Sequence, residues 1–262
     1  MPRFIGIDLA WSGKNPTGLA ALDTDPTGQV ATLLEPPTQT ILTDAPIVAF
    51  VEQAAGDDPT VIVAIDAPLA VPNFTGRRPA EARLSAAFQR FHAGAHPANR
   101  QRLGSYNGGE VRGEVIVQAL EHLGIRHSPV IAPRQPTRQV FEVYPHPAMI
   151  VLFNLDRVLK YKRRREGRRE EFKKYQNYLR GLQTASPALI IPASFDLLGE
   201  QHLDRRGKSL KAYEDQLDGI FCAYIGLYYW FWGTERCHIF GDADDYTKGY
   251  IVSPVDHRIS FR

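Results

Sequence analysis

The chain has 262 residues, of which 44% are hydrophobic and 23% are charged, and its formal net charge is +2. This composition supports a hydrophobic core and excludes a globally disordered chain, while the small net charge gives no whole-molecule argument for nucleic-acid binding. The length predicts one domain with insertions or a domain with a subdomain, and two cysteines, Cys222 and Cys237, are too few for a disulfide framework.

The first 68 residues predict four strands and one helix. Residues 3–10 and 59–68 are apolar runs rich in β-branched side chains, which is typical of buried strands. A DPTG turn separates two further strands, and a helix is indicated by a capping residue at Thr43 or Asp44 and a stop at Gly56. The predicted elements are strands over 3–10, 17–24, 29–35 and 59–68 and a helix over 43–56.

The rest of the chain is largely helical. Residues 70–135 form an irregular insertion, and residues 155–205 form a helical and highly charged segment. Pro145 and Pro147 are expected to stop the one further strand. The predicted elements are helices over 79–93, 113–124, 155–183 and 209–232, a strand over 138–147 and a hairpin over 237–254.

No segment of the chain has the pattern of a membrane anchor. The N-terminus lacks the basic and apolar regions of a signal peptide, and the most apolar window, which begins at Gly219, is too short to span a bilayer. We therefore expect a cytoplasmic protein with no membrane partner. The aromatic residues over 224–232 are expected to lie in the core or in an interface, which would suit a homodimer.

Carboxylates at the ends of buried strands are the main functional signal. Asp8 and Asp66 each end a long apolar strand, where ligands bind in open α/β sheets. Asp215 and Asp218 lie three residues apart, on one face of the last helix. Glu142 is a further candidate near the end of the fifth strand. A buried carboxylate needs a partner, and Mg²⁺ or Mn²⁺ prefers oxygen ligands of this kind, so we expect a metal site at Asp8, Asp66, Asp215 and Asp218.

Each of these acids also has a structural interpretation. Asp8 and Asp66 could form Asx turns or helix caps. Asp215 and Asp218 could be acids that favour the first turn of a helix, and Glu142 could pair with a nearby arginine. The combination of acids is a more specific signal than any one of them, because several unrelated structural roles would have to place acids at the same sheet edge by chance.

The order of these motifs resembles a known family. The segments GIDLAW, IDAPL, FEVYPHP, KAYEDQLDG and GYIVSP are similar to the DUF429 family, described as predicted ribonuclease H-like nucleases, and DQLDGIFCAY resembles the DxxDAxA helix of RuvC-type resolvases. The resemblance spans nearly the whole chain. It implies a single ribonuclease H-like domain over 1–262, with a mixed five-stranded sheet flanked by helices and a helical insertion after the fourth strand.

The same resemblance implies a nuclease-like site. Asp8 would match the first-strand acid, Asp66 the fourth-strand acid, and Asp215 and Asp218 the helix acids, while Glu142 matches the EVYP motif of DUF429. The chain has Gly219 where the resolvase motif has Ala, and Asp66 where resolvases have Glu. Catalytic roles for all five acids and a two-metal mechanism with Mg²⁺ or Mn²⁺ follow from the resemblance as expectations.

Basic residues supply candidate contacts to substrate phosphates. Arg77 and Arg78 lie in the insertion directly after Asp66, together with further arginines at 83, 90, 100 and 102. Lys208 and Lys211 flank the helix acids and could hold a phosphate or neutralise the acids. The run from Lys160 to Lys174 also contains glutamates and is typical of a solvated helix face, although nucleic-acid contact is an alternative.

Other motifs are weaker. His92 and His96 are four residues apart, but Gly94 and Pro97 predict a loop instead of a metal-binding helix. The GDADDY segment lacks the spacing of a calcium loop and predicts a hairpin turn.

Three functions remain open from the sequence. The first is metal-dependent hydrolysis of nucleic-acid phosphodiester bonds, with the kind of nucleic acid undetermined. The second is nucleotide phosphotransfer of the actin or sugar-kinase type, which would need a second copy of the fold and a second phosphate loop. The third is a non-catalytic nucleic-acid-binding protein of the same fold.

Overall fold

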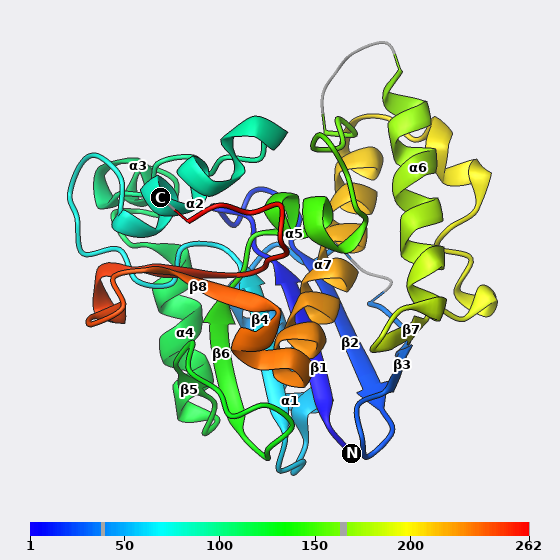
Figure 1. Cartoon of the computed structure of the whole chain (residues 1–262), viewed down its shortest axis with the longest axis horizontal. Coiled ribbons are helices and arrows are strands. Elements are labelled where there is room, and N and C mark those ends of the chain that lie inside the picture. Colours follow the sequence, from blue (N-terminus) through cyan, green and yellow to red (C-terminus); the bar gives the residue numbers. More distant parts are fainter. Residues whose placement is uncertain (38–39, 163–166, 262) are drawn as a thin grey trace.

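The structure is a computed structural model that describes residues 1–37, 40–162 and 167–261. Within these residues seven strands form one mixed and mostly parallel sheet in the order β5-β6-β4-β1-β2-β3-β7 (Figure 1). Its strands are β1 (Arg3–Asp8), β2 (Gly18–Thr24), β3 (Val30–Leu33), β4 (Val61–Asp66), β5 (Arg126–His127), β6 (Arg138–Glu142) and β7 (Ala188–Ile190). A separate antiparallel hairpin consists of β8 (Cys237–Gly241) and β9 (Tyr250–Pro254).

Helices cover both faces of the sheet. They are α1 (Asp44–Ala55), α2 (Pro79–Phe88), α3 (Arg100–Gly104), α4 (Arg112–His122), α5 (Pro145–Leu152), α6 (Arg168–Gly181) and α7 (Gly207–Trp232). Side chains alternate along a strand, so β1 contributes Phe4 to the core on the α7 side and Ile5 to the core beneath α1 and α4. None of the described helices has both the length and the apolarity needed to cross a membrane.

The sheet differs from the five-stranded expectation at its edges. All five expected strands are present, and the two additional ones, β5 and β7, have only two and three residues. Such short segments carry too little alternation for a sequence pattern to identify. The strand expected over 138–147 ends earlier, at Glu142, and the prolines at 145 and 147 instead open α5, since proline suits the first turn of a helix. The predicted hairpin after α7 is confirmed.

Helix α7 packs very closely on β1 and β2 because glycines face it. A Cβ added at Gly18 would lie 1.7 Å from the Asp215 carbonyl oxygen, and one added at Gly6 would lie 2.0 Å from the Gly219 carbonyl oxygen. Gly219 is itself restricted, since its Cβ would lie 2.8 Å from the Gly18 carbonyl carbon. The departure from the Ala of the resolvase motif therefore fits this closer helix–sheet contact.

Replacing Gly18 with alanine is expected to lower the free energy of unfolding by about 1–3 kcal/mol, because the new methyl group forces α7 away from β2. Gly181→Ala is the matched control, since nothing lies within 4 Å of its added Cβ. Urea denaturation of the two variants measures the difference. Equal stabilities would show that the contact between α7 and β2 is looser than described.

Candidate active site

Asp8 and Asp66 lie side by side at the carboxyl ends of two neighbouring parallel strands. They are direct partners in the register of β1 and β4. Asp8 alternates with Ile7 and Asp66 with Ile65, and both isoleucines belong to the core on the α1 and α4 side. The two carboxylates therefore belong to the face of the sheet that α7 covers.

The N-terminal half of α7 brings two more acids to this edge. Asp215 and Asp218 are almost completely buried, with exposed fractions of 1% and 0%. The hydroxyl groups of Tyr161 and Tyr175 donate hydrogen bonds to Asp218 Oδ1 at 2.7 and 3.0 Å. These two bonds hold the Asp218 carboxylate in one orientation.

Lys162 links the strand acids to the helix acids. Its Nζ lies 2.6 Å from Asp218 Oδ2 and 3.8 Å from Asp8 Oδ2, so one ammonium forms ion pairs with both carboxylates. Lys211 forms a second ion pair, with Asp215 on the same helix. The structure thus gathers the four aspartates named from the sequence and neutralises part of their charge with two lysines.

The carboxylates also perturb one another's ionisation. Burial raises the pKa of Asp8, and burial together with the Asp8 charge raises the pKa of Asp66 well above its ordinary value. Burial and the Asp8 carboxylate raise the pKa of Asp215 to about 8. Burial alone would lower the pKa of Lys162, but the surrounding carboxylates more than offset this and raise it. The raised pKa values show that the four aspartates do not all ionise readily beside two lysines, and an additional cation would favour their charged forms.

The donor set suits a hard divalent cation. Asp8 Oδ2 and Asp215 Oδ2 are buried and accept no hydrogen bond from the described residues. Carboxylate oxygens with free lone pairs are the ligands that Mg²⁺ and Mn²⁺ prefer. The cluster is not a preformed cage, however, because no three His, Cys, Asp or Glu side chains in the described ranges are already placed to hold a metal. The Lys162 ammonium lies between the Asp8 and Asp218 carboxylates.

Glu142 has a different environment from the aspartates. It alternates with Phe141 and Val143, whose side chains lie in the core on the α7 side. Its Oε1 and Oε2 accept bonds of 2.6 and 2.9 Å from the Arg78 guanidinium, and Oε2 also accepts one of 3.0 Å from the Leu69 amide. The alternative that the sequence left open, pairing with an arginine, is the arrangement found here.

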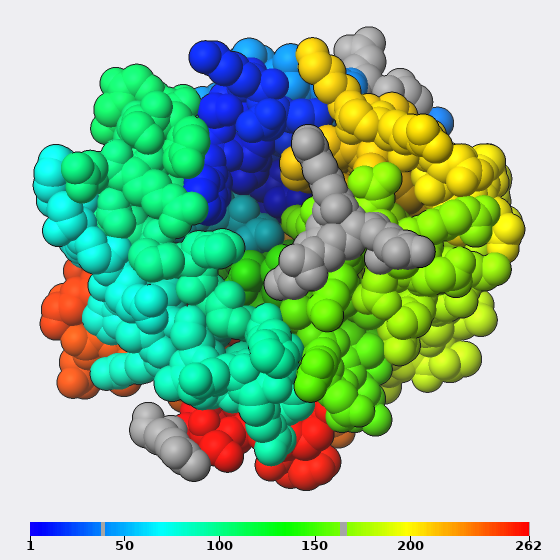
Figure 2. Space-filling model, turned by 90° about the horizontal axis from the view of Figure 1, so that it is seen from above, coloured from blue at the N-terminus to red at the C-terminus, as the bar shows by residue number. Residues whose placement is uncertain are grey.

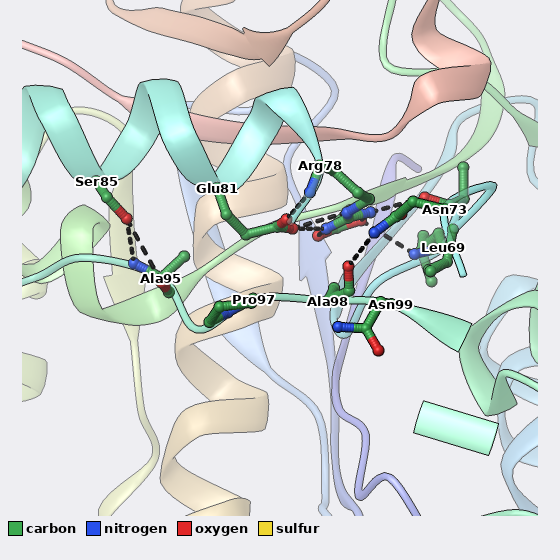
Figure 3. A network of polar contacts seen from close by, with 12 residues as sticks. Leu69, Asn73, Arg78, Glu81, Ser85, Ala95, Pro97, Ala98 and Asn99 are labelled. Carbon is green, nitrogen blue, oxygen red and sulfur yellow. Dashed lines mark hydrogen bonds and ion pairs between the residues drawn. The ribbon is translucent and has the colours of Figure 1, made fainter. Parts of the chain in front are cut away.

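Arg78 is buried, with an exposed fraction of 1%, at the start of α2. It also bonds Glu81 through both its backbone amide, at 2.8 Å, and its guanidinium (Figure 3). With Glu81, Glu142 and the Ala70 carbonyl as partners, its guanidinium is fully engaged. Arg78 therefore holds the insertion against β6, an arrangement that leaves it no free face for a substrate phosphate.

The other basic candidates differ in whether they face the cavity beside the acids. Arg77 is exposed, and Arg102 lies over the Trp11 ring, 5.0 Å from its centroid. Three further candidate arginines bond within the protein, namely Arg83 to the Gly241 carbonyl, Arg90 to the Arg258 carbonyl and Arg100 to Glu114. Lys208 and Lys211, by contrast, both line a cavity beside the acids.

Asp8 and Asp66 open onto a pocket of about 670 Å³. Its wall also includes His92 and His96. The expected helix over 79–93 ends earlier, at Phe88, so His92 lies outside the helix, and His96 lies in the expected loop. Further lining residues are Trp11, Tyr106, Tyr144, His146, Lys162 and Lys211. Figure 2 looks onto this edge of the molecule, where N-terminal atoms (blue), the insertion (cyan to green) and the residues leading into α7 (yellow) surround a hollow.

Sequence reasoning missed Lys162, Tyr161 and Tyr175. Lys162 belongs to the basic run that is typical of a solvated helix, yet it precedes α6 and turns toward the acids. Residues 163–166 of that run lie outside the described residues. The sequence does not distinguish Lys162 from its basic neighbours. Lys162 reaches the aspartates only because of the path that the chain takes after α5.

Comparison with protein families identifies the chain. A model described as "Protein of unknown function (DUF429)" matches residues 6–245. The chain belongs to the DUF429 family. The matched range includes all five acids. Comparisons with curated proteins and with solved structures gave no match.

Proposed function

We propose that this DUF429 protein is a metal-dependent nuclease that hydrolyses phosphodiester bonds of nucleic acid. The observation that carries the proposal is the convergence of Asp8 and Asp66, on adjacent strand ends, with Asp215 and Asp218 on α7. The central strand order β3-β2-β1-β4-β6, with β2 antiparallel to its neighbours, supports the ribonuclease H-like fold expected from the sequence.

The four aspartates would hold Mg²⁺ or Mn²⁺ in this proposal. When bound, such cations supply activation of the attacking water and stabilisation of the oxygen that leaves phosphorus. Tyr161 and Tyr175 fix the Asp218 carboxylate, and close packing of Gly18 against α7 sets the position of Asp215 relative to the strands. A cation held by these aspartates would compete with the Lys162 ammonium for Asp8 and Asp218.

Lys162 and Lys211 then have a second role. Both line the pocket that holds Asp8 and Asp66, and both carry a positive charge. Ammonium groups released from the carboxylates are well placed to contact the phosphate that is cleaved, since lysine binds phosphate as a flexible point charge.

Binding of Mn²⁺ tests the metal site without knowledge of the substrate. We expect calorimetry to detect Mn²⁺ binding to the wild type, and we expect Asp218→Asn to weaken it at least about tenfold, because one charged oxygen ligand is lost. Asp23→Asn, on β2 and outside the pocket lining, is the control and should bind as the wild type does. Equal affinities of the wild type and Asp218→Asn would exclude Asp218 as a ligand.

Activity is tested with labelled single-stranded and double-stranded DNA, RNA, hybrid and branched substrates, in Mg²⁺, in Mn²⁺ and without metal. The proposal requires metal-dependent cleavage of at least one of them. ATP hydrolysis or phosphotransfer without nucleic-acid cleavage would favour the phosphotransferase alternative instead. Metal-independent nucleic-acid binding without any cleavage would favour the non-catalytic alternative.

A further inference from the structure

A second cavity, of about 950 Å³, lies directly beside the acid pocket. The two cavities are adjacent, since Asn15, Lys162 and Lys211 line both of them. The size of the second cavity is in the range of pockets that hold nucleotide-sized ligands.

The lining of this basic cavity is strongly cationic. Its cations are Lys14, Lys162, Arg168, Arg206, Lys208 and Lys211, and its acid is Glu214. They come from the β1–β2 loop, the residues before α6, the start of α6 and the start of α7. Within the described ranges Lys14, Arg168, Arg206 and Lys208 make no salt bridge, whereas Lys162 and Lys211 pair with the aspartates. Four charges that pair with no acid of the described residues face one cavity, which favours an anionic ligand.

The start of α7 also favours an anionic ligand in this cavity. Gly207, Lys208 and Ser209 form its first turn, which contains no acid, and the N-cap residue Arg206 makes no side-chain capping bond. Amide groups at the start of a 26-residue helix present partial positive charge to the same space that the lysines face.

We propose that the basic cavity binds a second phosphate of the substrate, next to the phosphate held at Asp8 and Asp66. This inference rests on the proposed nuclease function and specifies its substrate as a nucleotide chain with at least two consecutive phosphates. Arg206 and Lys208 bind the second phosphate, while Lys162 and Lys211 lie between the two phosphate positions. A ligand with one phosphate fills only one of the two subsites and binds more weakly.

The test uses the double variant Arg206→Gln/Lys208→Gln. Lys173→Gln/Lys174→Gln is the matched control, since it removes the same charge from α6 residues that pair with Glu200 and Glu171 outside the cavity. Both pairs are made in the Asp8→Asn background, in the full chain, so that binding is measured without cleavage. Thermal unfolding verifies that both remain folded.

Binding of a fluorescein-labelled single-stranded 12-mer is measured by anisotropy at several salt concentrations. We expect the cavity pair to weaken binding about tenfold and to lower the salt-dependence slope by roughly 1, and we expect the control pair to remain within about twofold. An equal loss from both pairs, or no loss from the cavity pair, would overturn the cavity proposal. That result would leave the nuclease proposal standing if the wild type cleaves nucleic acid.

Competitors identify the source of the phosphate. A dinucleotide with a 5′-phosphate should displace the 12-mer at lower concentration than a nucleoside monophosphate or inorganic phosphate. Equal competition by inorganic phosphate would overturn the assignment to a nucleotide chain. If the cavity pair weakens binding but no metal supports cleavage, the cavity proposal is supported as a phosphate site and the nuclease proposal fails.

Discussion

Replacing Asp8 with asparagine is expected to reduce metal-dependent cleavage by about 100- to 1000-fold, the scale seen when one electrostatic group of a reacting centre is removed. Asp8 is connected to both the other strand acid and a helix acid. It adjoins Asp66 in the sheet, and it shares the ion-pair partner Lys162 with Asp218. The measurement is the initial rate on whichever nucleic acid the wild type cleaves, in Mg²⁺ and in Mn²⁺.

The same variant should not unfold the protein. Because burial raises the pKa of Asp8, its charged form is disfavoured in the folded state, and a neutral amide of the same shape removes that penalty. We expect an equal or higher melting temperature at pH 8 in metal-free buffer. A large loss of stability together with the loss of activity would mean that Asp8 has a structural role.

Glu142→Gln is the control, because Glu142 pairs with Arg78 and is not one of the four clustered aspartates. Its carboxylate bonds Arg78 and the Leu69 amide, so we expect cleavage within about threefold of the wild type. If Glu142→Gln loses as much cleavage activity as Asp8→Asn, then Glu142 is a catalytic residue, as the sequence pattern predicts.

The central strands and the four aspartates could be predicted from sequence because each has a local signal. Long apolar runs predict β1 and β4, and the i, i+3 spacing places Asp215 and Asp218 on one helix face. Parallel strands of an open sheet end at the same edge, so the meeting of Asp8 with Asp66 follows from strand order. The DUF429 motifs added the order of elements, which composition does not give.

The remaining features depend on contacts between segments distant in sequence. Arg78 and Glu142 are 64 residues apart, and nothing local distinguishes Arg78 from the exposed Arg77 beside it. Lys162 is selected from a basic run only by the path of the chain before α6. The basic cavity likewise combines loop, α6 and α7 residues, so its charges gather only in three dimensions.

Replacing Arg78 with methionine is expected to lower the free energy of unfolding by about 3–5 kcal/mol near pH 8, because it leaves two buried carboxylates facing each other without a cation. Glu81 and Glu142 have exposed fractions of only 1% and 3%, so water cannot solvate them in place of the guanidinium. Urea denaturation at pH 5, 6, 7 and 8 measures the loss.

The pH dependence identifies the cause of that loss. Burial raises the pKa of Glu142 to about 7 from an ordinary 4.5, even with Arg78 beside it. Folding therefore takes up a proton between these values, and this contribution to stability is present below pH 4.5 and is lost as pH rises to about 7. Without Arg78 the Glu142 carboxylate is protonated still more readily, so Arg78→Met should recover part of its stability at pH 5.

Glu142→Gln should have a milder effect. One guanidinium faces two carboxylates in this cluster, so replacing one carboxylate with a neutral amide leaves a balanced Arg78–Glu81 pair. The amide NH₂ replaces one acceptor oxygen and faces an N–H donor, so we expect a loss of about 1–2 kcal/mol at pH 8, well below that of Arg78→Met. If Glu142→Gln instead costs as much as Arg78→Met at pH 8, the cluster acts as a fully ionised triad, and the raised pKa of Glu142 is wrong.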